Sequence, residues 1–331
     1  MIAVALFGAG RIGAIHAANV AAHPALTLKY VVDPAAQPAE RLAATFGAAA
    51  VSSGQALADS AVAGVIIASS TNTHLDHCLA AAAAGKAIFC EKPIDLDLAR
   101  ARAAAPALAS AQMLLGFNRR FDPQFQALKA QLDTGAVGRL ETLNIVSHDP
   151  APPPIAYVKV SGGLFRDMAI HDFDTARWLL GEPPSEVFAA ASCLVDPAIG
   201  AAGDVDTAKI LLRTASGKLC LISNSRRSGY GYDQRIEAFG SGGMVRAGNV
   251  TESALATWSE AGAAADRFQN FFLDRYADAY RLEMDHFAEV LAGAAPRVGF
   301  ADGLAALAMA EAAAEASSFV NAATSASASV A

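Results

Sequence analysis

The chain has 331 residues, 53% of them hydrophobic, and a formal net charge of −7 at pH 7. This length exceeds what one hydrophobic core usually organises, so two domains are expected. The acidic balance and the lack of any Lys/Arg-rich segment argue against nucleic acid or an anionic membrane surface as a partner. No run of about 18 strongly apolar residues predicts a transmembrane helix. The partners expected are therefore small molecules.

The four cysteines, Cys78, Cys90, Cys193 and Cys220, lie far apart and show no CxxC spacing. This predicts neither a disulfide framework nor a zinc site, and it suits a reducing compartment. No other cluster of His, Cys, Asp or Glu has metal-ligand spacing, so no metal is expected. The N-terminus lacks a basic segment ahead of its first apolar run, so we expect no export signal and a cytoplasmic protein.

The first 118 residues alternate short apolar runs with helical segments, a pattern that predicts a parallel sheet. The expected strands are residues 2–7, 26–33, 65–69, 87–90 and 113–117. Helices are expected at residues 11–23, 38–46, 73–84 and 96–111. These helices are long enough to cross over and cover both sheet faces, as in a doubly wound α/β domain of the Rossmann type.

From residue 119 the pattern changes to one helix, residues 123–132, followed by longer β-rich runs. Strands are expected at residues 140–147, 186–194, 207–213, 218–225 and 234–240, and late helices at 271–292 and 301–320, before a tail (322–331) expected to fray. Thr-Ala-Ser-Gly at 214–217 is typical of a tight hairpin turn. The sequence thus predicts a first domain, 1–118, and a second α+β domain, 119–331, with a mostly antiparallel, open-faced sheet.

A GxGxxG motif lies between the first expected strand and the first expected helix. Gly8 permits a tight turn, Gly10 lets the backbone approach a pyrophosphate, and Gly13 lets the helix pack closely on the strand. Asp33 follows the second strand, where a carboxylate can accept hydrogen bonds from the adenosine ribose and repel the 2′-phosphate of NADP. The motif therefore predicts NAD as cofactor, bound by Gly8, Gly10, Arg11, Ile12, Gly13 and Asp33.

Four further segments complete a recognisable set: residues 69–74, Glu91-Lys92-Pro93, residues 116–123 and residues 161–172. With the glycine loop, they resemble the Gfo/Idh/MocA oxidoreductase family over nearly the whole chain. The block at 161–172 and the segment Tyr230-Gly231-Tyr232-Asp233-Gln234-Arg235 are most similar to its inositol 2-dehydrogenase branch. Ser70 departs from the family, because many relatives carry proline there.

The resemblance implies NAD-dependent oxidation of a secondary ring hydroxyl of a cyclic polyol, with myo-inositol giving 2-keto-myo-inositol (scyllo-inosose). It adds Ser69, Thr71, Asn72, His74, Glu91 and Lys92 to the cofactor site. It also places Lys92 beside the substrate, where an ammonium can stabilise alkoxide-like charge. It implies a substrate pocket of Arg119, Asp174, Tyr230 and Tyr276, with Asn118, His148 and Tyr232 as further candidates. Family members commonly form homotetramers through the open sheet face.

Asp167 and His171 are four residues apart, so on a helix over 166–180 they share one face. Histidine, with a reference pKa of about 6.5, can take a hydroxyl proton while a carboxylate stabilises the imidazolium. An arbitrary pair of this kind is usually a surface pair, but the surrounding block favours a catalytic role, with His171 as the base. Rival functions are dehydrogenation of another inositol isomer or an aldose, NAD-dependent glycoside hydrolysis, and non-catalytic NAD-binding regulation.

Overall fold

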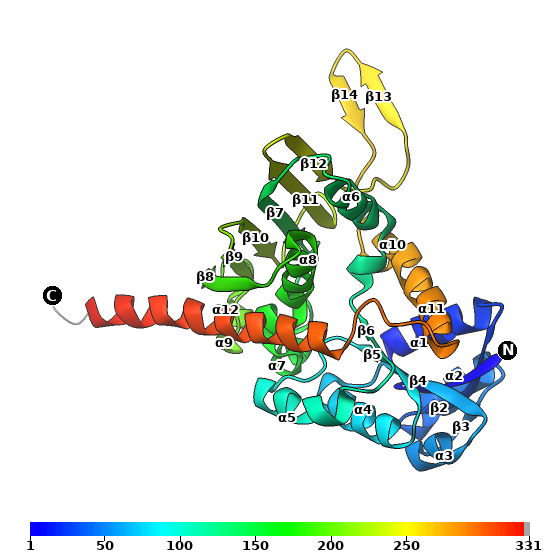
Figure 1. Ribbon diagram of the computed structural model, residues 1–331. Coiled ribbons are helices and arrows are strands. Elements are labelled where there is room, and N and C mark those ends of the chain that lie inside the picture. The colour runs from blue at the N-terminus through cyan, green and yellow to red at the C-terminus, as the bar shows by residue number, and fades with distance from the viewer. Residues whose placement is uncertain (328–331) are drawn as a thin grey trace. The chain divides into compact units, whose positions relative to one another are not determined.

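The computed structural model describes residues 1–327, with backbone only from 318 onward (Figure 1). The end of the predicted tail, residues 328–331, lies outside the described residues. The chain divides into two compact units. Unit 1 consists of Met1–Phe121 and Ala279–Leu307, and unit 2 consists of Asp122–Asp278 and the chain from Ala308 onward.

Unit 1 contains a six-stranded sheet in the order β3-β2-β1-β4-β5-β6, with every pair parallel. Its strands are β1 (Ile2–Phe7), β2 (Leu26–Val32), β3 (Ala49–Ala50), β4 (Val62–Ile67), β5 (Ala87–Glu91) and β6 (Met113–Gly116). The central strands are apolar almost throughout and rich in Val, Ile, Leu and Phe, because helices cover both faces of such a sheet. All five residues of β5 are buried. The predicted doubly wound domain is confirmed, and the only strand of this sheet that the sequence missed is the two-residue strand β3.

The four predicted helices of unit 1 follow the expected order, with boundaries within three residues of those expected. They are α1 (Arg11–Ala22), α2 (Ala36–Thr45), α4 (His74–Ala83) and α5 (Leu98–Leu108), with short segments α3 (Ser53–Ala58), η1 (Thr71–Thr73) and η2 (Asn118–Phe121). Side-chain caps explain two starts. Asp97 accepts hydrogen bonds from the first backbone N–H groups of α5, and Ser52 forms a capping box at α3.

A segment from the second half of the chain completes unit 1. It carries most of α11 (Ala277–Leu291) and the start of α12 (Phe300–Ser327). Phe287 packs edge-on against Phe89, with ring centroids 5.8 Å apart, and the Leu115 N–H donates to the Val298 carbonyl at 2.9 Å. The sequence placed this segment in the second domain. In the structure it packs with unit 1, which the sequence did not indicate because local periodicity finds a helix but not the sheet on which the helix packs.

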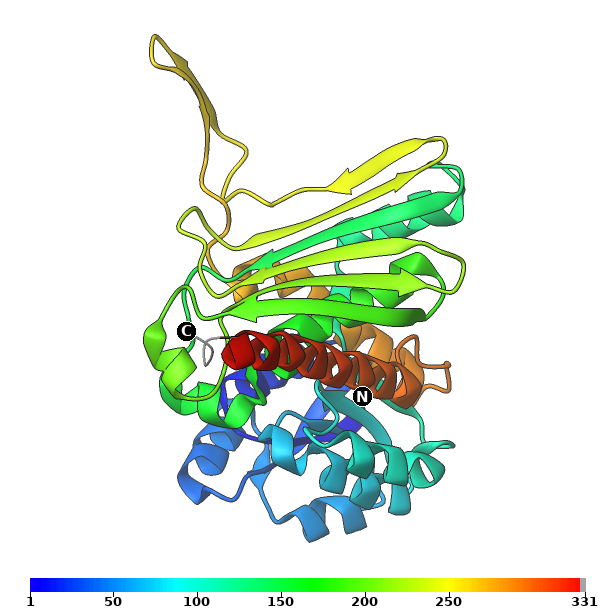
Figure 2. The same cartoon turned by 90° about the vertical axis from the view of Figure 1, so that its left-hand side faces the viewer.

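Unit 2 contains a second six-stranded sheet, in the order β12-β11-β7-β10-β9-β8 (Figure 2). Its strands are β7 (Leu140–His148), β8 (Pro184–Ser192), β9 (Thr207–Thr214), β10 (Leu219–Ser225), β11 (Asp233–Gly240) and β12 (Gly243–Ala247). Four of its pairings are antiparallel, and only β7 with β10 is parallel. The mostly antiparallel sheet is confirmed, including the β9–β10 turn, where the Gly217 N–H donates to the Thr214 carbonyl at 3.0 Å.

The remaining elements of unit 2 are α6 (Pro123–Asp133), α7 (Ile155–Ser161), η3 (Phe165–Ala169), α8 (Ile170–Leu180), α9 (Pro197–Ala201), β13 (Ala256–Ser259), β14 (Gly262–Ala265) and α10 (Phe272–Arg275). The hairpin of β13 and β14 projects from the rest of unit 2 in both views (Figures 1 and 2). The helix predicted at 271–292 is in fact two, α10 and α11, because the backbone leaves helical geometry at Tyr276.

One buried carboxylate organises the chain between β8 and β9. Asp206 accepts hydrogen bonds from the backbone N–H groups of Leu194, Val195 and Asp196 at 2.8 to 3.0 Å. Burial opposes its charge, but these donors prevail and lower the pKa of Asp206 to about 2. Across the described chain, helices of membrane-spanning length and hydropathy are absent.

Candidate active site and cofactor loop

The glycine loop after β1 has the geometry that a bound dinucleotide requires. Gly8 adopts φ +106°, and an added Cβ would meet the Ala68 carbonyl oxygen at 2.4 Å. At Gly13 an added Cβ would lie 2.0 Å from the Gly8 carbonyl oxygen, so α1 packs directly against the loop. Gly10, by contrast, faces open space, and it begins α1 without a side-chain cap. The helix N-terminus is therefore open to an anion, as NAD binding needs.

Asp33 lies at the end of β2, beside this loop. Its Oδ2 accepts the Ala9 N–H and its Oδ1 accepts the Ala35 N–H, both at 2.8 Å. Each carboxylate oxygen can accept a further bond. The side chain is thus held in place with acceptor capacity to spare, which fits the predicted contact with the adenosine ribose. The residues of unit 1 fit NAD.

The turn after β4 carries four of the predicted cofactor residues. Ser69 Oγ and Thr73 Oγ1 share a hydrogen bond of 2.7 Å, and Thr71 and Asn72 lie in η1. His74 is buried, with Nδ1 2.8 Å from the Pro93 carbonyl and Nε2 3.1 Å from the Ser69 carbonyl. Two carbonyl acceptors favour an imidazolium, whereas burial is the larger effect and lowers the pKa of His74. His74 therefore braces the turn against the end of β5, and a cofactor contact for it stays a prediction.

Glu91 and Lys92 stand at the carboxyl end of β5, the edge at which ligands bind in sheets of this kind. The Lys92–Pro93 peptide bond is cis. The Glu91 side chain points into unit 1, where Oε1 lies 2.7 Å from His16 Nε2. Arg119, predicted to bind substrate, is buried in η2 next to the buried Asn118. Unit 1 thus holds the predicted cofactor residues together with Lys92 and Arg119.

Unit 2 places Asp167 and His171 on one continuous helical stretch, but not on one regular helix. Asp167 lies in the π-helical turn η3, and His171 lies in the first turn of α8, which follows directly. A π turn adds a residue per turn and rotates the side chains before it relative to those after it. The predicted helix over 166–180 is therefore interrupted, and the spacing argument for a shared face holds only in part.

The carboxylate of Asp167 has two partners that the sequence did not indicate. Tyr157, from α7, donates its hydroxyl to Oδ1 at 2.8 Å. Arg226, which is 2% exposed, donates Nη2–H to Oδ2 at 3.3 Å. Arg226 also lies 4.0 Å from Asp204 and 3.9 Å from Asp149. A buried guanidinium surrounded by carboxylates compensates their charge, and with Tyr157 it holds the Asp167 side chain in a fixed orientation.

The other predicted substrate residues of unit 2 are not gathered in one place. Tyr276 is buried and donates its hydroxyl to Gln234 Oε1 at 3.1 Å, whereas Tyr230 donates to Asp233 Oδ2 at 2.7 Å. Asp233 and Gln234 are successive residues of β11, so their side chains point to opposite faces of the sheet. The two tyrosines therefore bond to opposite faces. Asp174 is buried on α8, and its predicted role is untested by this geometry.

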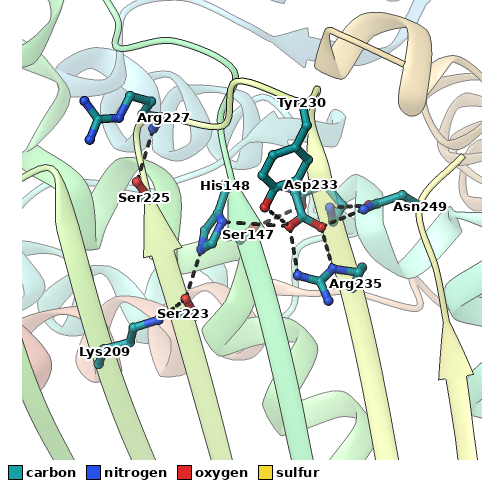
Figure 3. Close-up of polar contacts among 11 residues, drawn as sticks. Ser147, His148, Lys209, Ser223, Ser225, Arg227, Tyr230, Asp233, Arg235 and Asn249 are labelled. Atoms are coloured by element: carbon teal, nitrogen blue, oxygen red, sulfur yellow. Dashed lines mark hydrogen bonds and ion pairs between the residues drawn. The ribbon is translucent and has the colours of Figure 1, made fainter. Parts of the chain in front are cut away.

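Figure 3 shows the polar network around Asp233. This carboxylate accepts hydrogen bonds from Arg235 and Asn249 as well as from Tyr230. His148 Nε2 lies 2.9 Å from Ser223 Oγ, and its Nδ1 lies 3.8 Å from Asp233 Oδ2. Burial lowers the pKa of His148 against the raising effect of Asp233. Both ring nitrogens of His148 therefore contact side chains of neighbouring strands. Tyr232 packs against Tyr276 with ring centroids 6.0 Å apart.

Comparison with known proteins decides the family. The profile described as "Oxidoreductase family, NAD-binding Rossmann fold" matches residues 2–118, and that of the GFO/IDH/MocA C-terminal domain matches residues 125–246. The chain is 47% identical over 313 residues to an inositol 2-dehydrogenase from Rhizobium meliloti, covering 93% of this chain and 94% of the relative. The chain belongs to the GFO/IDH/MocA oxidoreductase family.

Solved structures of GFO/IDH/MocA members show the same fold. A myo-inositol dehydrogenase from Corynebacterium glutamicum aligns with a TM-score of 0.92 and 41% identity, covering 96% of this chain and 97% of that chain. A scyllo-inositol dehydrogenase from Lactobacillus casei, solved with NAD(H) and scyllo-inositol, aligns with a TM-score of 0.88 and 28% identity, covering 96% of both chains. The predicted fold class, the cofactor NAD and the enzyme class, an NAD-dependent dehydrogenase acting on CH–OH groups, are confirmed.

Sequence reasoning missed several residues around the candidate site of this GFO/IDH/MocA member. Arg226 is 59 residues from Asp167 and Tyr157 is ten residues before it on a separate helix, and neither carries a motif of its own. His16 and Glu283 join Glu91 only through tertiary packing. The one available signal was the position of His16, three residues after the last glycine of the cofactor loop and so one helical turn into α1.

Proposed function

We propose that this dehydrogenase oxidises one secondary ring hydroxyl of myo-inositol, giving 2-keto-myo-inositol (scyllo-inosose), with His171 as the base. The proposal is supported by similarity to an inositol 2-dehydrogenase over more than nine tenths of both chains. The structural observation that carries it is the position of Asp167, held by Tyr157 and Arg226 in the turn that leads into α8. A fixed carboxylate four residues before His171 suits a histidine that must accept a proton.

The proposal gives each side chain a separate role. When bound, NAD supplies the hydride acceptor. His171 takes the hydroxyl proton, and the negative charge of Asp167 favours the imidazolium that results. Lys92 hydrogen-bonds the reacting oxygen and stabilises its developing negative charge. Arg119, Asp174, Tyr230 and Tyr276 stay as predicted partners of the remaining ring hydroxyls, although the two tyrosines face different sides of β11.

The cofactor assignment is proposed residue by residue from the loop geometry. The glycine loop holds the pyrophosphate at the N-terminus of α1, and Asp33 accepts from the adenosine ribose. The turn after β4 and the end of β5 border the nicotinamide side. The residues assigned to NAD are Gly8, Gly10, Arg11, Ile12, Gly13, Asp33, Ser69, Thr71, Asn72, His74, Glu91 and Lys92.

The substrate is tested by following NADH absorbance after the purified protein is mixed with NAD and single candidate alcohols. The panel contains myo-inositol, scyllo-inositol, chiro-inositol, glucose and other aldoses. We expect the highest kcat/KM with myo-inositol. Preference for scyllo-inositol, the ligand of the Lactobacillus relative, or for an aldose would support the same dehydrogenation reaction but change the assigned substrate. If no alcohol yields NADH, the result would favour NAD-dependent glycoside hydrolysis or non-catalytic NAD-binding regulation instead.

The role of the base is tested with His171→Ala and Lys92→Ala. Each should lower kcat by about 10²- to 10⁴-fold, because acid-base and electrostatic groups contribute at that scale. NAD-induced thermal stabilisation, measured on the same samples, should persist and shows that the cofactor still binds. Turnover close to wild type in His171→Ala would exclude this histidine as the base.

We also propose that the protein is a cytoplasmic homotetramer in which the open face of the unit 2 sheet is buried. Phe188, Leu211 and Leu221 are neighbours across β8, β9 and β10 and are 37 to 55% exposed. Contiguous apolar surface of this kind usually marks an interface. Light scattering after size exclusion should report a tetramer, and Leu221→Lys should yield smaller species. All four cysteines are free thiols, which suits a reducing compartment.

A further inference from the structure

Three ionisable side chains meet in the core of unit 1, away from the described cofactor loop. His16 comes from α1, Glu91 from the end of β5 and Glu283 from α11. One ring nitrogen of His16 and one carboxylate oxygen of each glutamate all lie within 4.8 Å of one another. His16 and Glu283 are fully buried, and Glu91 is 8% exposed. Three such groups in one core are costly unless their charges and hydrogen bonds compensate each other.

The partners of the three side chains are unequal. Glu91 Oε1 lies 2.7 Å from His16 Nε2, so the imidazole can donate to a carboxylate. His16 Nδ1 has no hydrogen-bond partner among the described residues. Phe89 and Tyr280 enclose this ring edge-on at centroid distances of 4.8 and 5.9 Å, so water has little access to it.

Glu283 lacks any such support. Neither of its carboxylate oxygens has a hydrogen-bond partner within the described part of the chain. The titratable groups that face it are Glu91 from β5 and His16 from α1, and Tyr280 from its own helix packs against the His16 ring. No cation from these elements faces it. Burial, together with the negative charge of Glu91, raises the pKa of Glu283 well above its usual range.

We propose that Glu283 is a positioning residue for Lys92. Its carboxylic acid stays protonated at neutral pH and presents this proton to the Glu91 carboxylate. The contact fixes Glu91, the residue directly before Lys92. A rotation of its carboxyl group, or one buried water, joins the two acids. Gly116 on β6 makes room for this arrangement, because a Cβ there would lie 3.2 Å from Glu91 Oε2. The link to catalysis rests on the proposed function of Lys92; the proton on Glu283 does not.

The proton is tested on the wild-type enzyme by infrared spectroscopy at pH 7. Ordinary carboxyl groups are ionised at this pH, so a carboxylic-acid carbonyl band reports a buried protonated group. We expect such a band in the wild type and its loss in Glu283→Gln. Absence of the band in the wild type overturns the proposal. So does a stoichiometric metal ion found by elemental analysis, because a metal would require Glu283 to be ionised.

The pH dependence of stability gives a second test. A folded-state pKa above the unfolded value stabilises the protein fully at low pH, and the contribution is lost as pH rises through the folded pKa. Glu283→Gln keeps the shape of the protonated acid and cannot ionise. Above about pH 4.5, the wild-type unfolding constant should therefore rise relative to Glu283→Gln by tenfold per pH unit until Glu283 ionises in the folded state. Parallel pH profiles would contradict the proposal.

Positioning of Lys92 is tested by kinetics on the holoenzyme. Glu283→Ala removes the acid and leaves a cavity, so kcat should fall while KM for NAD changes little. Glu283→Gln should keep kcat close to the wild-type value. In this variant the loss of kcat at alkaline pH should also move to higher pH than in the wild type, which a role in packing alone would not cause. If both variants reduce kcat equally at pH 7, the positioning role is refuted. If the wild type oxidises none of the alcohols, the proposed function fails while the spectroscopic result still stands.

Discussion

Asp33 should control both the affinity for NAD and the discrimination against NADP. Its carboxylate already accepts the Ala9 and Ala35 N–H groups at 2.8 Å, one on each oxygen. The ribose hydroxyls would use the remaining acceptor sites. A hydrogen bond to a charged group contributes about 1.5 kcal/mol or more, so losing two of them amounts to about 3 kcal/mol. That loss corresponds to about a hundredfold weaker NAD binding in Asp33→Ala.

Asp33→Asn separates charge from geometry. The amide oxygen can still accept the Ala9 N–H, so the glycine loop should keep its shape, whereas the amide NH2 cannot accept the Ala35 N–H and that hydrogen bond is lost. Removing the negative charge also removes repulsion of the NADP 2′-phosphate. We expect KM for NAD to rise by about tenfold and the ratio of kcat/KM for NAD over NADP to fall in both variants. An unchanged ratio in both would refute the assignment of Asp33 to the ribose.

Three further predictions follow from single contacts. Gly13→Ala should abolish NAD-induced thermal stabilisation and lower the melting temperature, because its Cβ would lie 2.0 Å from a carbonyl oxygen; Gly10→Ala, with open space around it, should weaken NAD and leave the melting temperature unchanged. Asp206→Asn should lower the free energy of unfolding at pH 7 by about 2 kcal/mol, since the pKa of Asp206 is lowered from 3.8 to about 2. Because that stability is lost as pH falls from about 4 toward 2, wild type and variant should converge in acid denaturation; a constant gap would contradict this. Tyr157→Phe should reduce kcat about fivefold, because Asp167 loses one hydrogen bond of 2.8 Å, and unchanged kcat would show that Tyr157 does not support Asp167.

The first half of the fold could be predicted because its signals are local. The glycine loop and the buried strands are each indicated by a few neighbouring residues, and the structure places their boundaries within three residues of those expected. The tight turn between β9 and β10 was recognised for the same reason. Strand β3 was missed because two residues are too few to establish an alternation pattern.

The candidate site divides in the same way. Gly8, Gly13 and Asp33 were predicted with the geometry that the structure shows, since their roles depend on position relative to β1 and β2. The supporting side chains were not. Arg226 is 59 residues from Asp167 along the chain, and Glu91 is 75 residues from His16. Such pairs form only when the chain packs, and the local patterns of a single sequence do not indicate them. The π turn at Asp167 was also hidden, because its residues suit an ordinary helix.

Unit 1 is built from two segments that are far apart along the chain, and this affects how the enzyme folds during synthesis. Residues 279–307 supply the helix that covers β5 and the carbonyl that receives the Leu115 N–H. A ribosome therefore releases residues 122–278 of unit 2 before the segment that covers the unit 1 sheet, so until then the face of the sheet at Phe89 lacks the packing of Phe287. A fragment ending at residue 118 should expose this apolar surface and aggregate, although it contains the complete cofactor loop. Grafting the NAD site into another protein would require the late segment as well.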